Sequence, residues 1–327
     1  MLAEIELIKE VITHPDADRL DIVKVKGFPA IVSRGAFKVD DKVLFIYPDT
    51  VLPDSPWAEF YKKFNKKRVK AQKLRGIWSF GIVVSLKDVG LDDSLSVGDD
   101  ISSLGITKYV APAPQVSGGI GGLPVNLPKT DEEMFQKIDI SKYFGQKVDV
   151  TLKIDGSSWT AYCIRDESES DGFRFGITGR SVDFDVDKEN IYTIHNKTYN
   201  VESMLKCFCV ENDVSLAIRG EVYGKGIQNN SNNPHSKLEL DLALYSVFNF
   251  DEMKYERTGS KYYVFNINRA LNMVTVPIVE KDVEFNQDLI DKYLNSKKLN
   301  GQSFEGVVIN TVEDSFKIIN MDYDSRK

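Results

Sequence analysis

Residues 148–164, with the sequence VDVTLKIDGSSWTAYCI, decide the fold of the larger part of this chain. Apolar and polar residues alternate on both sides of Asp155-Gly156, a pattern typical of two strands joined by a tight turn. Lys153 ends the first strand, and Asp155 follows two residues later, on the same face if the strand continues. Gly156 suits a turn that needs close backbone approach or a positive φ angle. The stretch therefore predicts strand, tight turn and strand, with a lysine beside a carboxylate, and the alternative for Asp-Gly is an ordinary hairpin turn.

Lys153 is a candidate nucleophile. A lysine near its usual pKa of about 10.4 is protonated at neutral pH, and an ammonium group cannot attack phosphorus. Burial or neighbouring positive charge favours the neutral amine, and Lys317 or a metal ion could supply that charge. Read alone, the same lysine could equally be a surface residue at a strand end.

Five further segments place charged or aromatic residues within strand-like sequence, and their order along the chain matters below. They are TGR (178–180), RGEVYGKGIQ (219–228), LYSVFNF (244–250), SFEGVVIN (303–310) and SFKIIN (315–320). A carboxylate in an apolar strand is costly unless it is paired or bound to a cation, which applies to Glu221 and Glu305. With Asp155 they form an oxygen-rich set suited to Mg²⁺. The alternative is that both glutamates face solvent at sheet edges.

Cationic and aromatic candidates complete the set. Arg180 and Lys317 could stabilise charge that builds on phosphate oxygens during transfer. Phe248 could stack on a purine, although an aromatic residue in a strand can equally belong to the core. No His or Cys lies near Glu221 and Glu305, which disfavours a transition metal.

Length and composition indicate an intracellular protein of two domains. The 327 residues carry a net charge of −7 and three cysteines, which form no disulfide framework. There is no long apolar run and no signal-peptide pattern, so we expect no membrane span and a cytoplasmic location by default. We also expect a monomer.

One segment reverses the overall acidity. Residues 57–80 hold eight Lys or Arg and one Glu, with aromatic residues interleaved. Cations for phosphates and rings for bases favour a nucleic-acid surface, whereas the alternative is a solvated helix with its rings in the core. The candidate RNA-binding residues are Lys66, Lys67, Arg68, Lys70, Lys73 and Arg75.

The chain divides at a Pro-, Gly- and Ser-rich stretch. Residues 1–110 contain short strands that suggest a small β-barrel, with one helix candidate at 56–73. Residues 111–124 read as a flexible linker. Residues 125–327 read as an α+β domain of antiparallel strands with inserted helices. Its strand candidates are 147–154, 159–165, 173–178, 216–222, 242–250, 304–310 and 315–319, and its helix candidates are 130–138, 200–212, 261–273 and 286–298.

These segments resemble a known superfamily. HPDADRLDIVKVKG (14–27) is similar to the opening of OB-type tRNA-binding domains. The six ordered segments, beginning with Lys153-Ile154-Asp155-Gly156, resemble the motif series of covalent nucleotidyltransferases. Residues 68–86, 105–114 and 123–136 are similar to ATP-dependent RNA ligases that carry an N-terminal OB-like domain. The resemblance implies an OB-like β-barrel followed by a nucleotidyltransferase domain with antiparallel sheets and flanking helices.

The resemblance also implies an activity. Lys153 would take AMP from ATP, with Mg²⁺ or Mn²⁺ as cofactor, and the AMP would activate the 5′-phosphate of an RNA for attack by a 3′-OH. Position by position, Asp155, Gly156, Arg180, Glu221, Phe248 and Lys317 would contact ATP or AMP. Asp155, Glu221 and Glu305 would serve the metal. The alternatives are a DNA ligase or capping guanylyltransferase with the same lysine, or a non-catalytic RNA-binding module.

The sequence departs from the family pattern at one point. Many ligases have a second lysine in the last motif, whereas Lys317 is followed by Ile318 and Ile319.

Overall fold

The chain forms two compact units, Met1–Pro112 and Ala113–Lys327, each considered by itself. The computed structural model describes residues 1–65, 68–109, 118–123, 127–128 and 132–323. Within these ranges no helix is long and apolar enough to cross a membrane.

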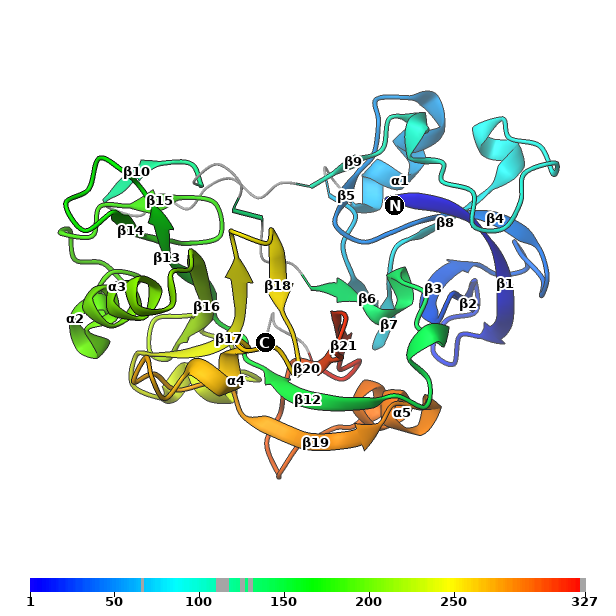
Figure 1. Cartoon of the computed structure of the whole chain (residues 1–327). Coiled ribbons are helices and arrows are strands. Elements are labelled where there is room, and N and C mark those ends of the chain that lie inside the picture. Colours follow the sequence, from blue (N-terminus) through cyan, green and yellow to red (C-terminus); the bar gives the residue numbers. More distant parts are fainter. Residues whose placement is uncertain (66–67, 110–117, 124–126, 129–131, 324–327) are drawn as a thin grey trace. The chain divides into compact units, whose positions relative to one another are not determined.

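The first unit is built on a five-stranded antiparallel sheet of order β3-β2-β1-β4-β8 (Figure 1). The first half of β1 pairs with β4, whereas its second half pairs with β2 after a bulge between Ile8 and Glu10. Sharing one long strand in this way curls the sheet into an OB-like half-barrel. The strands are β1 (Ala3–Thr13), β2 (Leu20–Val25), β3 (Phe28–Ser33), β4 (Lys42–Ile46) and β8 (Ile82–Ser85).

Smaller elements complete this unit. They are the helix α1 (Pro56–Asn65), the pair β5 (Thr50–Val51) and β9 (Thr107–Lys108), the hairpin β6 (Gln72–Leu74) and β7 (Ile77–Ser79), and 3₁₀ turns at Leu86–Val89 and Ser102–Leu104. The prediction of one helix over 56–73 is therefore wrong for residues 68–73, which contain no helix and run into β6, whereas residues 66–67 lie outside the described residues. Arg75 and Gly76 both have positive φ, which is the geometry of a tight hairpin turn and is incompatible with a continuing helix.

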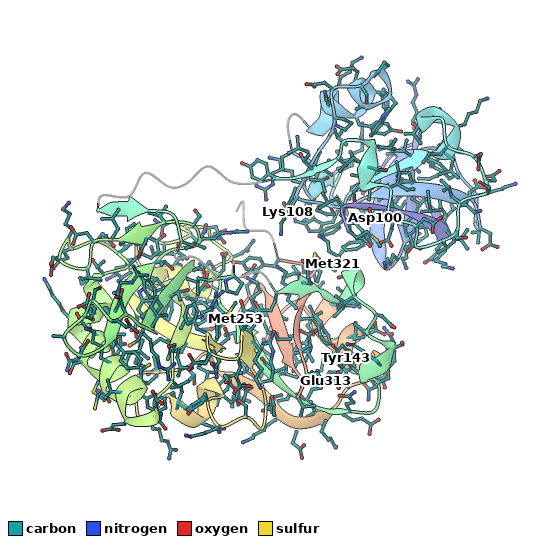
Figure 2. All side chains as sticks on the ribbon, turned by 45° about the horizontal axis from the view of Figure 1, so that its top comes forward. Asp100, Lys108, Tyr143, Met253, Glu313 and Met321 are labelled. Carbon is teal, nitrogen blue, oxygen red and sulfur yellow. The ribbon has the colours of Figure 1, made fainter. Side chains whose placement is uncertain are left out.

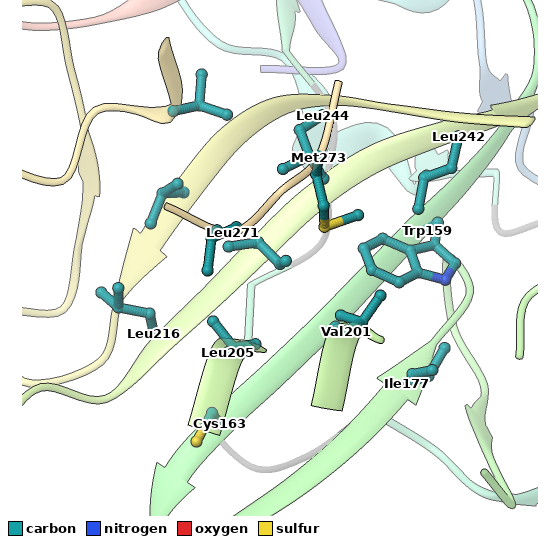
Figure 3. Packing of buried hydrophobic residues seen from close by; sticks show 14 of the residues in the cluster. Trp159, Cys163, Ile177, Val201, Leu205, Leu216, Leu242, Leu244, Leu271 and Met273 are labelled. Atoms are coloured by element: carbon teal, nitrogen blue, oxygen red, sulfur yellow. The ribbon is translucent and has the colours of Figure 1, made fainter. Parts of the chain in front are cut away.

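The second unit holds a seven-stranded sheet, called here the large sheet, of order β10-β15-β14-β13-β16-β17-β18 (Figure 1). In β16, Leu216, Ile218 and Val222 point into an apolar core, and the alternate residues point to the opposite face. Helix α3 covers the core side with Val201, Leu205 and Cys209. Figure 3 shows Val201 and Leu205 packed towards Trp159 and Leu216.

The bounds of this part are as follows. The strands are β10 (Gly119–Gly121), β13 (Ser157–Arg165), β14 (Phe173–Thr178), β15 (Asp183–Phe184), β16 (Leu216–Tyr223), β17 (Asp241–Asn249) and β18 (Lys254–Glu256), and the helices are α2 (Ile194–Tyr199), α3 (Val201–Asn212) and α4 (Val264–Ile267). A 3₁₀ turn lies at Pro234–Lys237.

A second sheet, called here the small sheet, has the order β11-β21-β20-β12-β19. Helix α5 packs on one face, where Val148, Val150 and Phe316 join its Ile290 in a separate core. Tyr143 belongs to that core, donates to Asp314 Oδ2 at 3.3 Å, and lies beside the turn that carries Glu313 (Figure 2). The elements are β11 (Glu133–Met134), β12 (Lys147–Lys153), β19 (Ile278–Glu284), β20 (Gly306–Asn310), β21 (Ser315–Ile319) and α5 (Gln287–Asn295), with 3₁₀ turns at Phe135–Lys137 and Ser141–Tyr143.

All seven strands predicted for this unit are present, and so are the helices predicted at 200–212 and 286–298. The helix predicted at 130–138 is wrong, because Glu133–Met134 pairs in parallel with Phe316–Lys317. The helix predicted at 261–273 is confined to α4. Strand β19 was not predicted from the sequence.

Candidate active site

The small sheet turns one face towards its core and the other towards the large sheet. Asp149, Thr151 and Lys153 alternate in β12 with the core residues Val148, Val150 and Leu152, so they share the second face. Lys153 lies opposite Gly306 in β20. The polar residues of this strand are therefore collected on the side that α5 does not cover.

The large sheet presents a matching polar face. Arg219 and Glu221 alternate in β16 with core residues, and Glu221 lies opposite Ser158 in β13. The Asp155–Gly156 turn leads the chain directly from β12 in the small sheet to β13 in the large one. Two sequence-distant strands thus bring Lys153 and Glu221 to a common site between the sheets.

Lys153 makes an ion pair at this site. Its Nζ lies 2.6 Å from Glu305 Oε2, and both side chains are about three-quarters buried or more, with exposed fractions of 26% and 20%. Burial by itself lowers the pKa of Lys153, but the negative charges of Glu305, Glu221 and Asp155 outweigh it and raise the pKa above its ordinary value. The sequence led us to expect a lysine biased towards the neutral amine, whereas this arrangement holds it as an ammonium.

Burial and mutual repulsion raise the pKa values of two carboxylates at this site. Burial raises the pKa of Glu221 to about 8, the Lys153 ammonium opposes that rise, and Glu305 and Asp155 add to it. Burial also raises the pKa of Glu305, again opposed by Lys153. Three acids around one lysine leave excess negative charge, and such a site is stabilised by an added cation.

Gly156 is required where the two sheets meet. A Cβ atom at this position would lie 2.7 Å from Glu221 Cγ and would also collide with the carbonyl oxygen of Val222. The glycine therefore serves close approach between the turn and β16, one of the two uses expected from the sequence.

Asp155 is held by residues that the sequence analysis did not identify. Its Oδ2 accepts hydrogen bonds from Tyr323 Oη at 2.5 Å and from Asn230 Nδ2 at 3.2 Å. The asparagine-rich stretch NNSNN (229–233) was the available signal, because asparagine side chains commonly bond to nearby backbone in turns. Its partner could not be read without the fold.

A cavity of about 250 Å³ lies between the sheets, with walls from β16, β17 and β18 on one side and β11 and β21 on the other. Arg219 is 0% exposed in its wall. The guanidinium donates through Nη2 to the carbonyl oxygen of Pro128 and lies 5.2 Å from the Tyr255 ring centroid, while Nε and Nη1 have no partner among the described residues. The lining residues are Pro128, Glu132, Glu133, Ile138, Arg219, Tyr245, Ser246, Tyr255, Arg257, Asp314 and Ser315.

The other candidates occupy different positions. Lys317 lies opposite Val308 on the same face of the small sheet as Lys153, and its charge acts on Glu305. Phe248 is 3% exposed and packs edge-on against Phe250 and Tyr255. Arg180 is exposed in the turn after β14, a strand separated from β16 by β13.

The basic residues of the first unit divide into two groups. Lys73 and Arg75 belong to the β6–β7 hairpin, where the Lys73 ammonium lies 5.6 Å from the Trp78 ring centroid. The Arg68 guanidinium lies 4.3 Å from the Tyr109 ring centroid and pairs with Asp49, and Lys70 is exposed. Lys66 and Lys67 lie outside the described residues.

The donors for a metal are oxygens. Among the described residues, no three His, Cys, Asp or Glu side chains form a group that could hold a metal by themselves. Asp155, Glu221 and Glu305 nevertheless concentrate buried negative charge around Lys153. That donor chemistry suits Mg²⁺ or Mn²⁺, since Mg²⁺ is usually bound by one or two carboxylates together with substrate phosphates.

Comparisons with known proteins agree with this architecture. The model of a family described as RNA ligase matches residues 146–324, and that of an OB-fold domain matches residues 2–86. The chain is similar to Naegleria gruberi RNA ligase solved with PPi, at 26% identity and a TM-score of 0.75, covering 98% of this chain and 96% of the other.

Two mutants of the same Naegleria enzyme, each solved with ATP and Mn, are similarly related. One has 25% identity, a TM-score of 0.76 and coverages of 98% and 97%. The other has 26% identity, a TM-score of 0.73 and coverages of 98% and 95%. No curated protein matches the chain. The matches confirm the expected family and the OB-like first domain.

Proposed function

The chain belongs to the RNA ligase family, and from that premise we propose that it uses ATP and a divalent cation to join RNA 3′-OH and 5′-phosphate ends through a lysyl-AMP intermediate on Lys153. The observation that carries the proposal is the placement of Lys153 against Glu305 and Glu221 between two sheets. The relatives solved with ATP and Mn, or with PPi, support the same chemistry.

In the first step, the lone pair of the neutral Lys153 amine attacks the α-phosphorus of ATP. An N–P bond forms, the bond from this phosphorus to the bridging oxygen breaks, pyrophosphate leaves and the amine loses a proton to solvent. Lys153 must first leave its ion pair with Glu305 and release its ammonium proton to solvent before the amine can attack.

In the second step, an oxygen of the RNA 5′-phosphate attacks the same phosphorus. The N–P bond breaks, the lysine regains a proton, and the RNA end carries AMP through a pyrophosphate link. In the third step, a 3′-OH attacks the RNA phosphorus and loses its proton, and AMP leaves. Lys317 lies on the Lys153 face of the small sheet and would stabilise charge on the phosphate oxygens.

A divalent cation would be held by Glu221, Glu305 and Asp155 together with phosphate oxygens, and it would supply positive charge where the reaction builds negative charge. Glu221 and Glu305 have the chemistry for this role, because burial and repulsion between the carboxylates raise the pKa of each, and a bound cation would relieve that repulsion.

We assign the nucleobase to the cavity between the sheets. Arg219 offers two donors there that have no partner among the described residues, and a purine edge carries acceptors. Three carboxylates also line the cavity, so a neutral base fits it better than a phosphate. The resemblance assigns base stacking to Phe248, whereas the ring of β17 that lines the cavity is Tyr245. Tyr245→Leu and Phe248→Leu, compared by the ATP concentration for half-maximal labelling, separate the two assignments.

RNA contacts are assigned to the first unit. The cation and ring pairs of Lys73 with Trp78 and of Arg68 with Tyr109 have the chemistry that binds phosphates and bases. Arg180 would contact the ribose or the RNA 3′-end, as the resemblance implies.

The test is covalent labelling with α-³²P-ATP and Mg²⁺. The wild type should become labelled and Lys153→Ala should not, whereas Lys147→Ala, which changes an exposed lysine at the start of the same strand, should label normally. Label retained by Lys153→Ala, or absent from the wild type, contradicts the proposal. Labelling by GTP instead of ATP would indicate a capping enzyme, and sealing that accepts a DNA 3′-OH strand equally well would indicate a DNA ligase.

A further inference from the structure

The Asp155–Gly156 turn is held by hydrogen bonds from the loop that follows β16. Asn233, which is 2% exposed, donates from Nδ2 to the carbonyl oxygen of Asp155 at 2.8 Å. Gln228 Nε2 donates to the carbonyl oxygen of Gly156 at 3.3 Å. Asn230 donates to the Asp155 carboxylate itself, so this loop contacts both the backbone and the side chain of the turn.

A second set of contacts comes from the residues that follow β21. Asn320 is tied to the strand of Glu305, because its N–H donates to the carbonyl oxygen of Glu305 at 2.9 Å and its Nδ2 to that of Phe304 at 3.0 Å. Tyr323 N–H then donates to the carbonyl oxygen of Asn320 at 3.2 Å. This places Tyr323, which is 7% exposed, with its hydroxyl on Asp155.

Both side-chain donors converge on one carboxylate oxygen. Among the residues that the structure describes, Tyr323 and Asn230 both donate to Oδ2 of Asp155, and neither bond reaches Oδ1. Two donors on a single oxygen fix the rotation of the carboxylate. The negative charge of the carboxylate held in this way acts on Lys153, whose pKa it helps to raise.

We infer that Tyr323 and Asn230 are positioning residues for the adenylylation step, holding Asp155 in the orientation that Lys153 and the phosphates require. The inference rests on the proposed function and extends it to two residues outside the motif series. Because they come from the large-sheet loop and the small-sheet end, they fix Asp155 relative to both walls of the site. Small displacements of a reacting group cost rate steeply, so orientation of this carboxylate bears on turnover more than on ATP binding.

The experiment measures single-turnover labelling with α-³²P-ATP over a range of ATP concentrations. Tyr323→Phe removes one donor and leaves the ring. Asn230→Asp keeps the Oδ1 atom that accepts hydrogen bonds from the backbone N–H groups of Asn232 and Asn233. It replaces the Nδ2 donor to Asp155 by an oxygen, so that hydrogen bond is lost. Each should lower the rate at saturating ATP by roughly tenfold, the scale of a lost hydrogen bond to a charged group, with the half-saturating ATP concentration changed less than about twofold.

A matched control exists in the same unit. Tyr293 also donates its hydroxyl to a carboxylate, that of Glu280, on the α5 side of the small sheet. Tyr293→Phe should label at the wild-type rate, and thermal melting of all variants reports whether the fold persists.

Each outcome has one meaning. A wild type that labels while Tyr323→Phe and Asn230→Asp match its rate, or lose no more than Tyr293→Phe, overturns the inference and leaves the proposed function intact. A higher half-saturating ATP concentration with an unchanged maximal rate also overturns it. A wild type that never labels refutes the proposed function instead.

Discussion

Glu221→Gln should stabilise the metal-free protein at alkaline pH and much less at acidic pH. Burial raises the pKa of Glu221 from its ordinary 4.5 to about 8 in the folded protein. The folded state therefore binds this proton more tightly than the unfolded chain does. The stability contributed by the proton is fully present below pH 4.5 and is lost as the pH rises to about 8. Glutamine carries no such proton and does not suffer that loss.

The size of the effect follows from the pKa difference. At about 1.4 kcal/mol for each pKa unit, the change from 4.5 to about 8 corresponds to about 5 kcal/mol. The side chain of Glu221 is partly exposed, and solvent screening reduces the figure to about 2 kcal/mol. That amount corresponds to about 5 °C in the melting temperature of a unit of this size.

The assay is urea unfolding of wild type and Glu221→Gln in EDTA at pH 4.5 and pH 9. The difference in free energy of unfolding between variant and wild type should grow by about 2 kcal/mol towards the higher pH. Glu284→Gln, which changes an exposed carboxylate at the end of β19, should give the same difference at both values. If the Glu221→Gln difference does not change with pH, Glu221 is not the crowded acid described above.

The remaining predictions concern other parts of the site. Gly156→Ala should destabilise the protein by about 2 kcal/mol through its collision with β16, seen as a lower melting temperature, whereas Gly121→Ala, where a Cβ would have no described atom within 4 Å, should not. Arg219→Met should raise the ATP concentration for half-maximal labelling without lowering the melting temperature, because it removes a buried charge with two donors that lack a partner among the described residues. Chelating divalent cations with EDTA should abolish labelling, and Mn²⁺ should restore it. Replacing Lys73 and Arg75 by alanine should weaken RNA binding and reduce the slope of log affinity against log salt by about 1.4 in electrophoretic shift assays.

The sequence predicted the strands well because their pattern is local. In β12 the alternation of Val148, Val150 and Leu152 with Asp149, Thr151 and Lys153 identifies the strand and also its two faces. The same alternation in β16 places Glu221 on a site-facing side. Lys153, Glu221 and Glu305 could therefore be named together before their distances were known.

The errors arose where distant pairing decides the outcome. Glu133–Met134 has a helix-compatible sequence, yet it forms a strand because β21 offers it an edge. The contacts of Asn230 and Tyr323 with Asp155 join segments far apart in the chain, so no local sequence pattern predicts them. The raised pKa of Lys153 likewise depends on how many carboxylates the fold gathers around it, which no local pattern shows.

Neighbouring residues along strand β16 have different roles, because their side chains point to opposite faces of the large sheet. In β16 one set of alternate side chains packs into the core under α3, and the intervening residues Arg219 and Glu221 lie on the opposite face. A substitution at a site-facing position can therefore alter which nucleotide or RNA end is accepted while the supporting scaffold stays intact. Substitutions at these positions can therefore change specificity during evolution without loss of the fold. The same positions are suitable targets for mutagenesis that aims to alter specificity.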